Sequence, residues 1–388
     1  PHNYLYYLAT PPLLYGVIPR HLKAEGLNRE GDGFRRIVVE KPFGYDLSSA
    51  LELNRIYLDA FREEQIYRID HFLGKETVQN ILALRFANSV FEPLWNRNYI
   101  DYVEITAVEN MGIGTRGGFY DGVGTLRDMV QNHLAQLLAV TAMEPPAAFD
   151  ASGFRNEVVK VYQSLTPLTG EDIRHSVVRG QYMASEGRKG YREEEQVPAL
   201  SRTETYLAMR LELNNWRWGG VPFYIRTGKQ MPTKVSEIVI HFKPAPYSLF
   251  RCEGGTCPVP NRLVIRIQPN EGIVLRLGMK KPGEGFEVLP MDMDFSYAEL
   301  GRLPTEDAYA RLIEDCIAGD PTLFIRSDAV ESGWRFFDPI LKYWQDVPEC
   351  PLYGYPAGSW GPLEADSLVA RQGASWPCLL YTSPSPRD

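Results

Sequence analysis

The most restrictive feature of the sequence is a strand–helix–strand pattern between residues 36 and 70. Residues 36–40, RIVVE, are mostly apolar, as in a strand that is buried on both faces. The segment KPFG interrupts this run, and Asp46 is well placed to cap a helix over 46–61. QIYRID at 65–70 then predicts another strand. This order is typical of the last part of an α/β nucleotide-binding domain.

The pattern changes in the second half of the chain. Five segments beyond Thr203 tend to alternate apolar and polar residues, which indicates strands with one buried face: 205–215, 222–229, 237–243, 261–268 and 272–279. A further strand is expected before Thr203, at 102–109. The helices expected around them cover 75–88, 124–142, 306–319 and 329–344. We therefore expect an α/β part followed by a large β+α domain with an extended antiparallel sheet.

The charge of the chain narrows the class of partner. The formal net charge is −8 and no polybasic run stands out, so we expect neither nucleic acid nor a membrane surface as a partner. A basic pocket inside an acidic protein still allows an anionic small molecule. We also expect no membrane span, because no stretch of about 18 apolar residues is present. Five cysteines do not make a disulfide framework in a chain of this length, which indicates a cytoplasmic enzyme.

Two of these cysteines, Cys252 and Cys257, lie close together in CEGGTC and resemble half of a metal site. No second cysteine pair and no nearby histidine completes the ligand set that a structural metal requires. We therefore expect no metal.

Both ends of the sequence differ from those of an intact natural chain. It begins at Pro1 without a methionine, and residues 378–388, CLLYTSPSPRD, look like a translated sequencing adapter. We treat 1–377 as natural sequence and 378–388 as a non-native tail, and we expect further natural sequence upstream of Pro1.

The decapeptide YRIDHFLGKE brings together three side chains that can carry a charge, Asp70, His71 and Lys75. A solvated loop is one interpretation, and a site for an anionic substrate with an acid/base pair is another. Successive side chains of an extended segment point to opposite faces. We therefore expect Asp70 and His71 to serve different partners.

The helix expected over 124–142 is apolar except for a few residues, which include Asp128 and His133. Residues five apart in an α-helix lie about 140° apart around its axis. These two side chains can therefore flank a pocket, but they are poorly placed to pair with each other. If His133 is a base, its orienting carboxylate comes from elsewhere, and Asp70 is a candidate.

A glycine pattern at 111–118, MGIGTRGG, is a candidate for a dinucleotide-binding loop. Gly112, Gly114 and Gly117 match the spacing G-x-G-x-x-G. However, FYDGVG follows before any helix can start, and no strand–helix–strand unit with a later acidic residue is present. We therefore assign no coenzyme loop to this segment.

Seven segments, taken in order, resemble the glucose-6-phosphate dehydrogenase family: EKPFG, YRIDHFLGKE, LRFAN, WNR, RDMVQNHLAQLL, PFYIRTGK and IRIQPNEG. The resemblance runs from about residue 3 to 376, and RIDH-x-LGKE is its most specific part. It implies the end of a Rossmann-type coenzyme domain over 1–70 and a substrate and dimerisation domain over 71–377. The implied reaction is the oxidation of glucose 6-phosphate at C1 to 6-phosphogluconolactone, the first step of the oxidative pentose phosphate pathway.

The resemblance also implies a coenzyme and an assembly. The coenzyme is NADP, with NAD as the alternative, and the protein forms a homodimer or homotetramer through its antiparallel sheet. The glycine-rich fingerprint of the family would lie upstream of Pro1. We therefore expect this chain to be a fragment that does not reduce NADP by itself.

The family's catalytic machinery maps onto four residues. The resemblance implies that His133 is the catalytic base and that Asp70 is the carboxylate that holds it. His71 and Lys75 match ligands of the substrate phosphate. Phe72 stands where the family usually has tyrosine, so one hydroxyl donor is missing and we expect weaker phosphate binding.

The resemblance implies further substrate ligands elsewhere in the chain. Lys41 matches a lysine that contacts both substrate and coenzyme. The others are carboxylates that bind sugar hydroxyls and basic or amide groups that face the substrate: Glu109, Asp128, Lys229, Lys234 and Gln268.

Two other functions remain as alternatives. A non-catalytic sugar-phosphate-binding protein would keep the phosphate ligands but would not need a base. A glycosidase using Glu109 and Asp128 would need neither the lysines nor the strand before KPFG.

Overall fold

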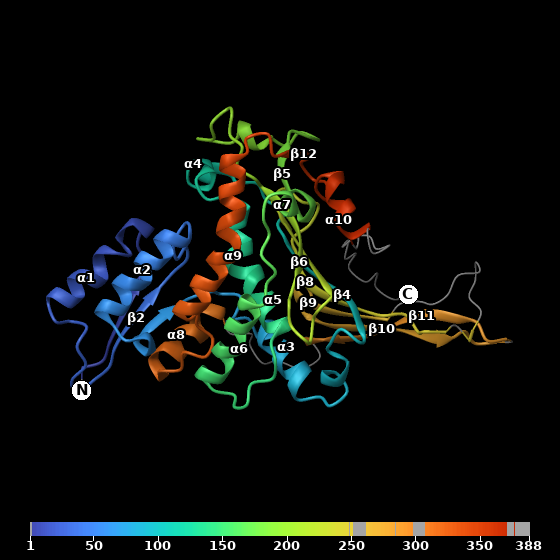
Figure 1. Cartoon of the computed structure of the whole chain (residues 1–388), viewed down its shortest axis with the longest axis horizontal. Coiled ribbons are helices and arrows are strands. Elements are labelled where there is room, and N and C mark those ends of the chain that lie inside the picture. The colour runs from blue at the N-terminus through green and yellow to red at the C-terminus, as the bar shows by residue number, and fades with distance from the viewer. Residues whose placement is uncertain are drawn as a thin grey trace, which may run out of the picture.

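The computed structural model describes residues 2–247, 249–250, 261–283, 285–297, 307–370 and 376. It contains a small parallel sheet near the N-terminus and a much larger sheet built from the rest of the chain (Figure 1). The Cys252/Cys257 pair and the tail at 378–388 both lie outside the described residues. Within the described ranges, no helix has the length and apolar character needed to cross a bilayer.

The small sheet has the alternating architecture expected from the strand–helix–strand pattern. Its three parallel strands lie in the order β1 (Tyr4–Leu8), β2 (Arg35–Val39) and β3 (Ile66–Arg68). The helices α1 (Val17–Ala24) and α2 (Leu47–Ala60) connect them. Asp46 caps α2 as predicted, because its carboxylate accepts from the backbone N–H of Ser49 at 2.7 Å. The strand β1 is an additional element that the sequence pattern did not predict.

Helices from the far end of the chain cover this small sheet. They are α8 (Ala308–Ala318) and α9 (Ser327–Asp346), and Figure 1 shows both beside the N-terminal strands. Arg36 on β2 donates to the carbonyl of Cys316 at 2.6 Å, and Trp334 on α9 donates to the carbonyl of Phe43 at 3.1 Å. The last part of the chain therefore completes the core of the first part.

The large sheet has nine strands, in the order β11-β10-β9-β8-β4-β7-β6-β5-β12. Their bounds are β4 (Ile100–Val108), β5 (Val177–Met183), β6 (Tyr206–Glu212), β7 (Pro222–Gly228), β8 (Val235–Phe242), β9 (Arg262–Gln268), β10 (Gly272–Lys280), β11 (Val288–Ser296) and β12 (Tyr353–Pro356). The sheet is mainly antiparallel, as predicted. The pairs β4–β7 and β5–β12 are parallel, and β5, β11 and β12 are strands that the sequence pattern did not predict.

Alternation along the strands gives the large sheet two buried faces. On β7, Phe223 and Ile225 pack into the main core, whereas Tyr224 between them packs into a second core on the opposite face. Helices cover the main core, and α10 covers part of the second. The helices not yet given are α3 (Glu76–Phe86), α4 (Gly117–Asp121), α5 (Ala135–Ala142), α6 (Ala151–Gln163), α7 (Glu171–Ser176) and α10 (Asp366–Ala370).

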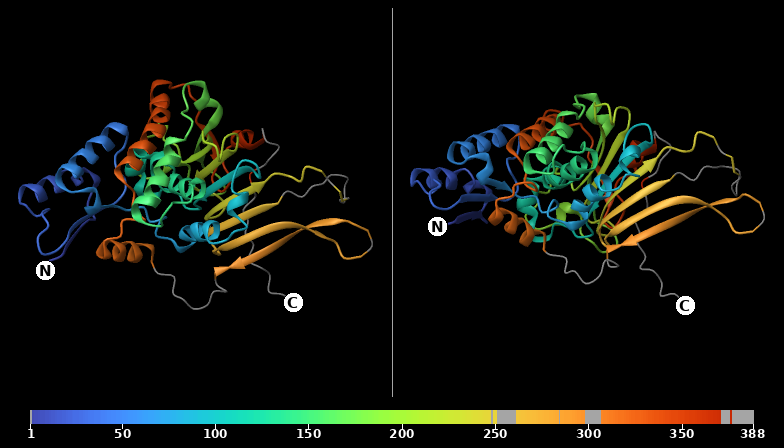
Figure 2. Two further views of the ribbon diagram at one scale, coloured as in Figure 1. Left: turned by 60° about the horizontal axis from the view of Figure 1, so that its bottom comes forward. Right: turned by 90° about the horizontal axis from the view of Figure 1, so that it is seen from below.

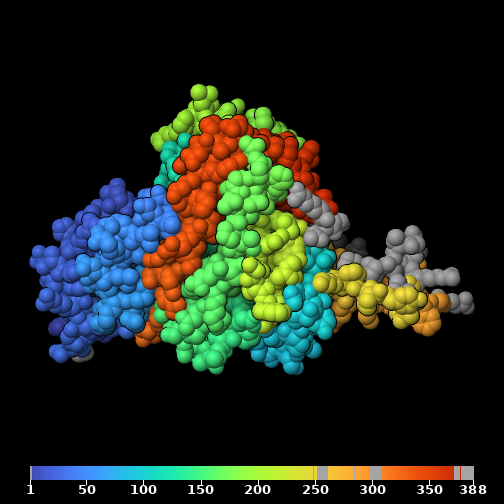
Figure 3. All heavy atoms as spheres, in the orientation of Figure 1, coloured from blue at the N-terminus to red at the C-terminus, as the bar shows by residue number. Residues whose placement is uncertain are grey.

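The strands β10 and β11 extend beyond the helical layer as a long hairpin (Figure 2). In the space-filling view the same strands project from the body of the molecule (Figure 3). One face of this hairpin is apolar, because Leu277 and Met279 on β10 lie opposite Met291 and Leu289 on β11. Met279 and Met291 are each 55% exposed. The hairpin therefore exposes an apolar sheet face to solvent.

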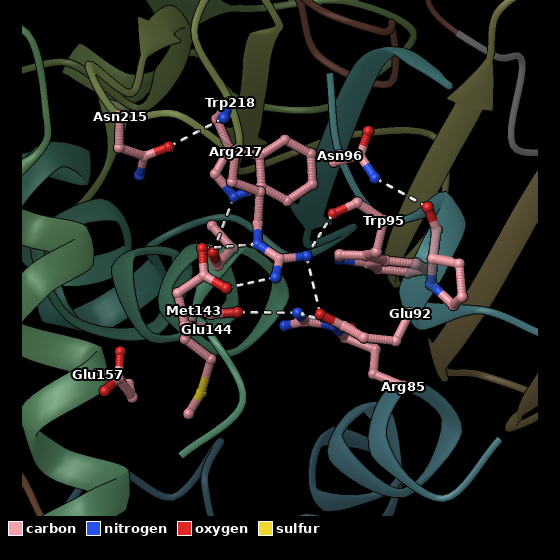
Figure 4. Close-up of polar contacts among 12 residues, drawn as sticks. Arg85, Glu92, Trp95, Asn96, Met143, Glu144, Glu157, Asn215, Arg217 and Trp218 are labelled. Carbon is pink, nitrogen blue, oxygen red and sulfur yellow. Dashed lines mark hydrogen bonds and ion pairs between the residues drawn. The ribbon is translucent and has the colours of Figure 1, made fainter. Parts of the chain in front are cut away.

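The C-terminal end of α5 is held by side chains from distant parts of the chain (Figure 4). A helix leaves its last carbonyls without partners inside the helix. Arg85 donates to the carbonyls of Val140 and Thr141, both at 3.1 Å, and to that of Met143 at 2.8 Å. Tryptophan indoles donate to the carbonyls of Thr141 and Ala142, each at 2.8 Å.

Two carboxylates and a second arginine complete this network. Arg85 pairs with Glu92 at 3.2 Å, and Glu92 also pairs with Arg217 at 2.8 Å (Figure 4). Arg217 reaches Glu144 as well, with its Nε 2.8 Å from the carboxylate. The network therefore fixes the C-terminal end of the continuous helix on which His133 lies nine residues before Ala142.

We predict that Arg85→Ala lowers the free energy of unfolding by about 3–5 kcal/mol, because it leaves several buried carbonyls without donors. Urea unfolding followed by tryptophan fluorescence measures this loss. The matched control is Arg55→Ala, since Arg55 pairs with Glu52 at the surface, and we expect almost no change in the free energy of unfolding. Equal losses in the two variants would contradict the structural role of the buried arginine.

Candidate active site

Strand ends of the large sheet converge on one edge. Because β4 and β7 are parallel, the residues that follow them, Glu109 and Lys229, lie side by side and form an ion pair. The strand β8 runs antiparallel to β4 and begins at the same edge, directly after Lys234. The strand β9 ends there at Gln268. Four predicted site residues, distant in sequence, thus meet through strand pairing alone.

The small sheet delivers a second group of side chains to the same place. Its parallel strands β2 and β3 end two residues before Lys41 and Asp70, respectively. The chain then forms a tight turn rather than the extended segment that the sequence suggested, with the N–H of Leu73 donating to the carbonyl of Asp70 at 3.1 Å. The turn leads through His71 and Lys75 into α3.

Asp70 and His133 form the predicted pair. The distance from His133 Nδ1 to Asp70 Oδ1 is 2.6 Å, and both residues are buried. Burial by itself raises the pKa of the Asp70 carboxyl, but His133 and the N–H of Phe72 lower it, and the net shift is downward. The ionised carboxylate holds the Nδ1 proton, which leaves Nε2 as the nitrogen that can accept a proton.

The helix that carries Asp128 and His133 differs from the one predicted. Residues Leu126–Leu134 form a π-helix that continues as α5. In a π-helix the hydrogen bonds join residues five apart, so a side chain lies nearly above the one five positions earlier. The expected angle of about 140° is therefore wrong, and both side chains face the same cavity.

Asp128 is a permanent anion held between two lysines. Its carboxylate lies 3.2 Å from the Nζ of Lys41 and 3.2 Å from the Nζ of Lys229. Burial favours the neutral acid, but the two ammonium groups lower the pKa of Asp128 to about 2. Lys41 Nζ also lies 2.8 Å from Nε2 of His133, the ring nitrogen that Asp70 does not contact.

These groups enclose a cavity of about 180 Å³. Nine of the ten predicted site residues line it, and the tenth, Asp70, is buried behind His133. Five cationic and two anionic side chains face the cavity: Lys41, Lys75, Arg116, Lys229, Lys234, Glu109 and Asp128. The excess of positive charge fits an anionic ligand, in a protein whose overall net charge is −8.

Sequence reasoning missed two polar lining residues, Arg116 and Ser236. Arg116 lies inside the glycine pattern at 111–118, which follows β4 of the large sheet and not a strand of the parallel sheet. The arginine within that pattern was the signal available, because a cation beside flexible glycines can approach an anion. Ser236 near the start of β8 carries no such signal.

The two predicted phosphate ligands differ in charge. Burial, and then the electrostatic influence of the neighbouring His133 ring, lower the pKa of His71 to about 4, so His71 is a neutral hydrogen-bond donor near pH 7. Burial, and then the charge of Lys234, lower the pKa of Lys75 to about 8. Lys75 is therefore charged at neutral pH but loses its proton under mildly alkaline conditions.

A metal is a poor fit to the same groups. Ligand atoms of Asp70, His71 and His133 lie within 4.8 Å of one another. However, Asp70 and His133 already bond to each other, and the ammonium of Lys41 lies 2.8 Å from the free nitrogen of His133. A divalent cation would have to displace or deprotonate that ammonium.

Comparisons with known proteins agree with this geometry. Residues 1–80 match the family described as "Glucose-6-phosphate dehydrogenase, NAD binding domain", and residues 82–377 match "Glucose-6-phosphate dehydrogenase, C-terminal domain". The chain is 55% identical to the glucose-6-phosphate 1-dehydrogenase of Aggregatibacter actinomycetemcomitans, over 96% of this chain and 75% of that protein. The corresponding enzyme of Treponema pallidum is 52% identical, over 96% of this chain and 73% of that protein.

A solved structure is similar over the same range. It is a glucose-6-phosphate dehydrogenase in complex with its substrate glucose-6-phosphate, and it superposes with a TM-score of 0.89 at 36% identity. The match covers 96% of this chain and 75% of that structure.

We predict that inorganic phosphate binds this cavity about tenfold more weakly at pH 9 than at pH 7. Inorganic phosphate gains rather than loses negative charge over this range, so any weakening comes from the protein, where Lys75 loses its charge as the pH rises through about 8. Titration calorimetry measures the dissociation constants. In Lys75→Arg the guanidinium stays charged, so the affinity should be nearly constant, and an equally steep loss in this variant would contradict the assignment.

Proposed function

Because the chain belongs to the glucose-6-phosphate dehydrogenase family, we propose that it oxidises glucose 6-phosphate at C1 to 6-phosphoglucono-1,5-lactone. The observation that carries this proposal is the buried Asp70–His133 pair at the wall of a cationic cavity. A base beside phosphate ligands is what the oxidation of a phosphorylated sugar requires.

The residues around the cavity fit a nicotinamide coenzyme. Lys41 lies just beyond the carboxyl end of the parallel strand β2 and also lines the substrate cavity. The carboxyl ends of parallel strands are where α/β domains bind such coenzymes. The coenzyme, when bound, supplies the acceptor for the hydride that leaves C1.

His133 moves the proton in this reaction. As the C1–H bond breaks, Nε2 of His133 takes the proton of the C1 hydroxyl and a carbonyl forms at C1. Asp70 stabilises the resulting imidazolium through the 2.6 Å contact at Nδ1. Lys41, now 2.8 Å from Nε2, would give up this position to the substrate hydroxyl and remain beside the developing carbonyl oxygen.

The remaining cavity residues hold the substrate. Lys75 and Lys234 supply charge to the phosphate and His71 supplies a neutral donor, which fixes the far end of the sugar. Glu109 and Asp128 accept from sugar hydroxyls. Lys229 contacts both carboxylates and holds them in position as acceptors.

The alternatives account for less of the site. A glycosidase needs one carboxylic acid with a raised pKa. Burial raises the pKa of Asp128, but the two lysines outweigh this effect and lower the pKa to about 2. A sugar-phosphate-binding protein has no use for a buried carboxylate that orients His133. Coenzyme reduction with glucose 6-phosphate, and no sugar release from glycosides, distinguishes the proposed enzyme from both.

Three finer points extend the proposal. We propose NADP rather than NAD, which a comparison of kcat/KM for the two coenzymes tests. We propose a domain boundary near residue 70, where the chain leaves β3 and enters the substrate turn. We also propose a cytoplasmic enzyme, which fits the free thiols of Cys316 and Cys350.

The assembly that we propose is a homodimer, or a tetramer of two dimers, formed through the large sheet. The apolar hairpin face of β10 and β11 supports it, since Met291 and Met293 are 55% and 63% exposed. A second copy of the same surface would cover these side chains from water.

We predict that His133→Asn in the full-length enzyme lowers kcat by roughly 10²–10⁴-fold, because the general base is lost, while the dissociation constant for glucose 6-phosphate changes little. Single-turnover coenzyme reduction measures the first quantity and calorimetry the second. Near-normal turnover in this variant would exclude His133 as the base.

We predict that Met291→Glu combined with Met293→Glu converts the dimer to a monomer, because two carboxylates would be buried at the interface. Light scattering coupled to size exclusion reads the mass. The control is Asp292→Asn, because Asp292 lies between the two methionines in the strand but points to the opposite face of the hairpin. If the double variant remains dimeric, the interface lies elsewhere.

A further inference from the structure

One oxygen of the catalytic carboxylate has no partner among the residues that the structure describes. Oδ1 of Asp70 accepts from His133 at 2.6 Å and from the N–H of Phe72 at 3.0 Å. Oδ2 is buried and accepts from no group in the described ranges. A buried carboxylate oxygen without a donor is costly, and structures rarely leave one in that state.

A buried tyrosine hydroxyl has a hydrogen-bond donor but no acceptor for it among the described residues. The hydroxyl of Tyr162, on α6, also lacks a partner within the described part of the chain. Burial, and then the negative charge of Asp70, raise the pKa of Tyr162 well above its usual value. The phenol is therefore always protonated, and it is a donor close enough to Asp70 to respond to its charge.

A small cavity lies beside Tyr162. It holds about 20 Å³, enough for one water. Its wall also includes Ile69 and Asn132, the residues that precede Asp70 and His133 in the chain. Tyr162 therefore lines this cavity, next to the chain positions of the pair, and does not line the substrate cavity.

We infer that Tyr162 is a positioning residue whose hydroxyl donates to Oδ2 of Asp70 through one bridging water. Such a water would satisfy two buried polar atoms that otherwise lack partners among the described residues. The inference rests on the proposed function only in that it treats His133 as the base. Tyr162 touches no substrate and acts through Asp70.

This contact would set the proton affinity of the pair. A donor to Oδ2 stabilises the carboxylate, and hence the form of the pair that has not yet taken a proton. Without the donor, the pair binds a proton more readily and its apparent pKa rises. The other charged or titratable groups around the pair lie on other elements and are unchanged by a substitution at 162: Lys41, His71, Lys75, Asp128 and Tyr309.

The test is Tyr162→Phe, which removes only the hydroxyl. In protein with ¹⁵N-labelled histidine, the signal of His133 is assigned by its loss in His133→Asn and is then followed by NMR against pH. We expect the midpoint of this signal to rise by about one unit in Tyr162→Phe. This titration needs no coenzyme and no turnover.

Tyr206→Phe is the matched control. Tyr206 is equally buried and its hydroxyl also lacks a partner among the described residues, but it belongs to the second core of the large sheet. We expect no shift of His133 in this variant. An unchanged midpoint in Tyr162→Phe, or an equal shift in both variants, would overturn the inference.

Enzyme kinetics separate this inference from the proposed function. In the full-length enzyme, the acidic limb of kcat/KM should move up by the same unit in Tyr162→Phe, with little change in KM for glucose 6-phosphate at the plateau. If the unmodified enzyme fails to oxidise glucose 6-phosphate, the proposed function fails. The histidine titration still decides the role of Tyr162 in that case.

Discussion

The hydrogen bond between Asp70 and His133 is the constraint on which the rest of the site depends. It joins a turn that follows the small parallel sheet to a helix that packs on the large sheet, at 2.6 Å. A contact this short between buried groups tolerates little relative movement of the two parts. The helices α8 and α9 reinforce it, because they return from the far end of the chain to cover the small sheet.

The helix bearing His133 is anchored at both ends for the same reason. At its start, the backbone N–H of Leu126 donates to the carboxylate of Glu204 at 3.0 Å. At its end, Arg85 and two tryptophan indoles saturate the last carbonyls of α5. Between these anchors the π-helical turns place Asp128 and His133 on one face. A rare backbone conformation is thus held by strong contacts on either side and is used to bring two functional groups together.

Much of the architecture was predictable from local patterns. The apolar run before KPFG and the cap at Asp46 correctly predicted β2 and α2, because both signals depend on neighbouring residues only. The alternating segments beyond Thr203 correctly predicted β6 to β10. β12 was missed because four residues are too few to show a period. The parallel pairing of β4 with β7 was missed because strand direction depends on the route of the chain between them.

The sequence by itself determined which chemical groups the site contains. The decapeptide with Asp70, His71 and Lys75 and the polar residues of the 124–142 helix made an acid/base pair one interpretation, and the family resemblance then named the pair and the phosphate ligands. Only the tertiary structure decided how these groups meet: which oxygen of Asp70 is occupied, that Asp128 is an anion between two lysines, and that the hydroxyl of Tyr162 is buried without a partner among the described residues. The physical reason is that residue types and spacings are local properties, whereas proton affinities and partners depend on burial and on charges brought from distant parts of the chain.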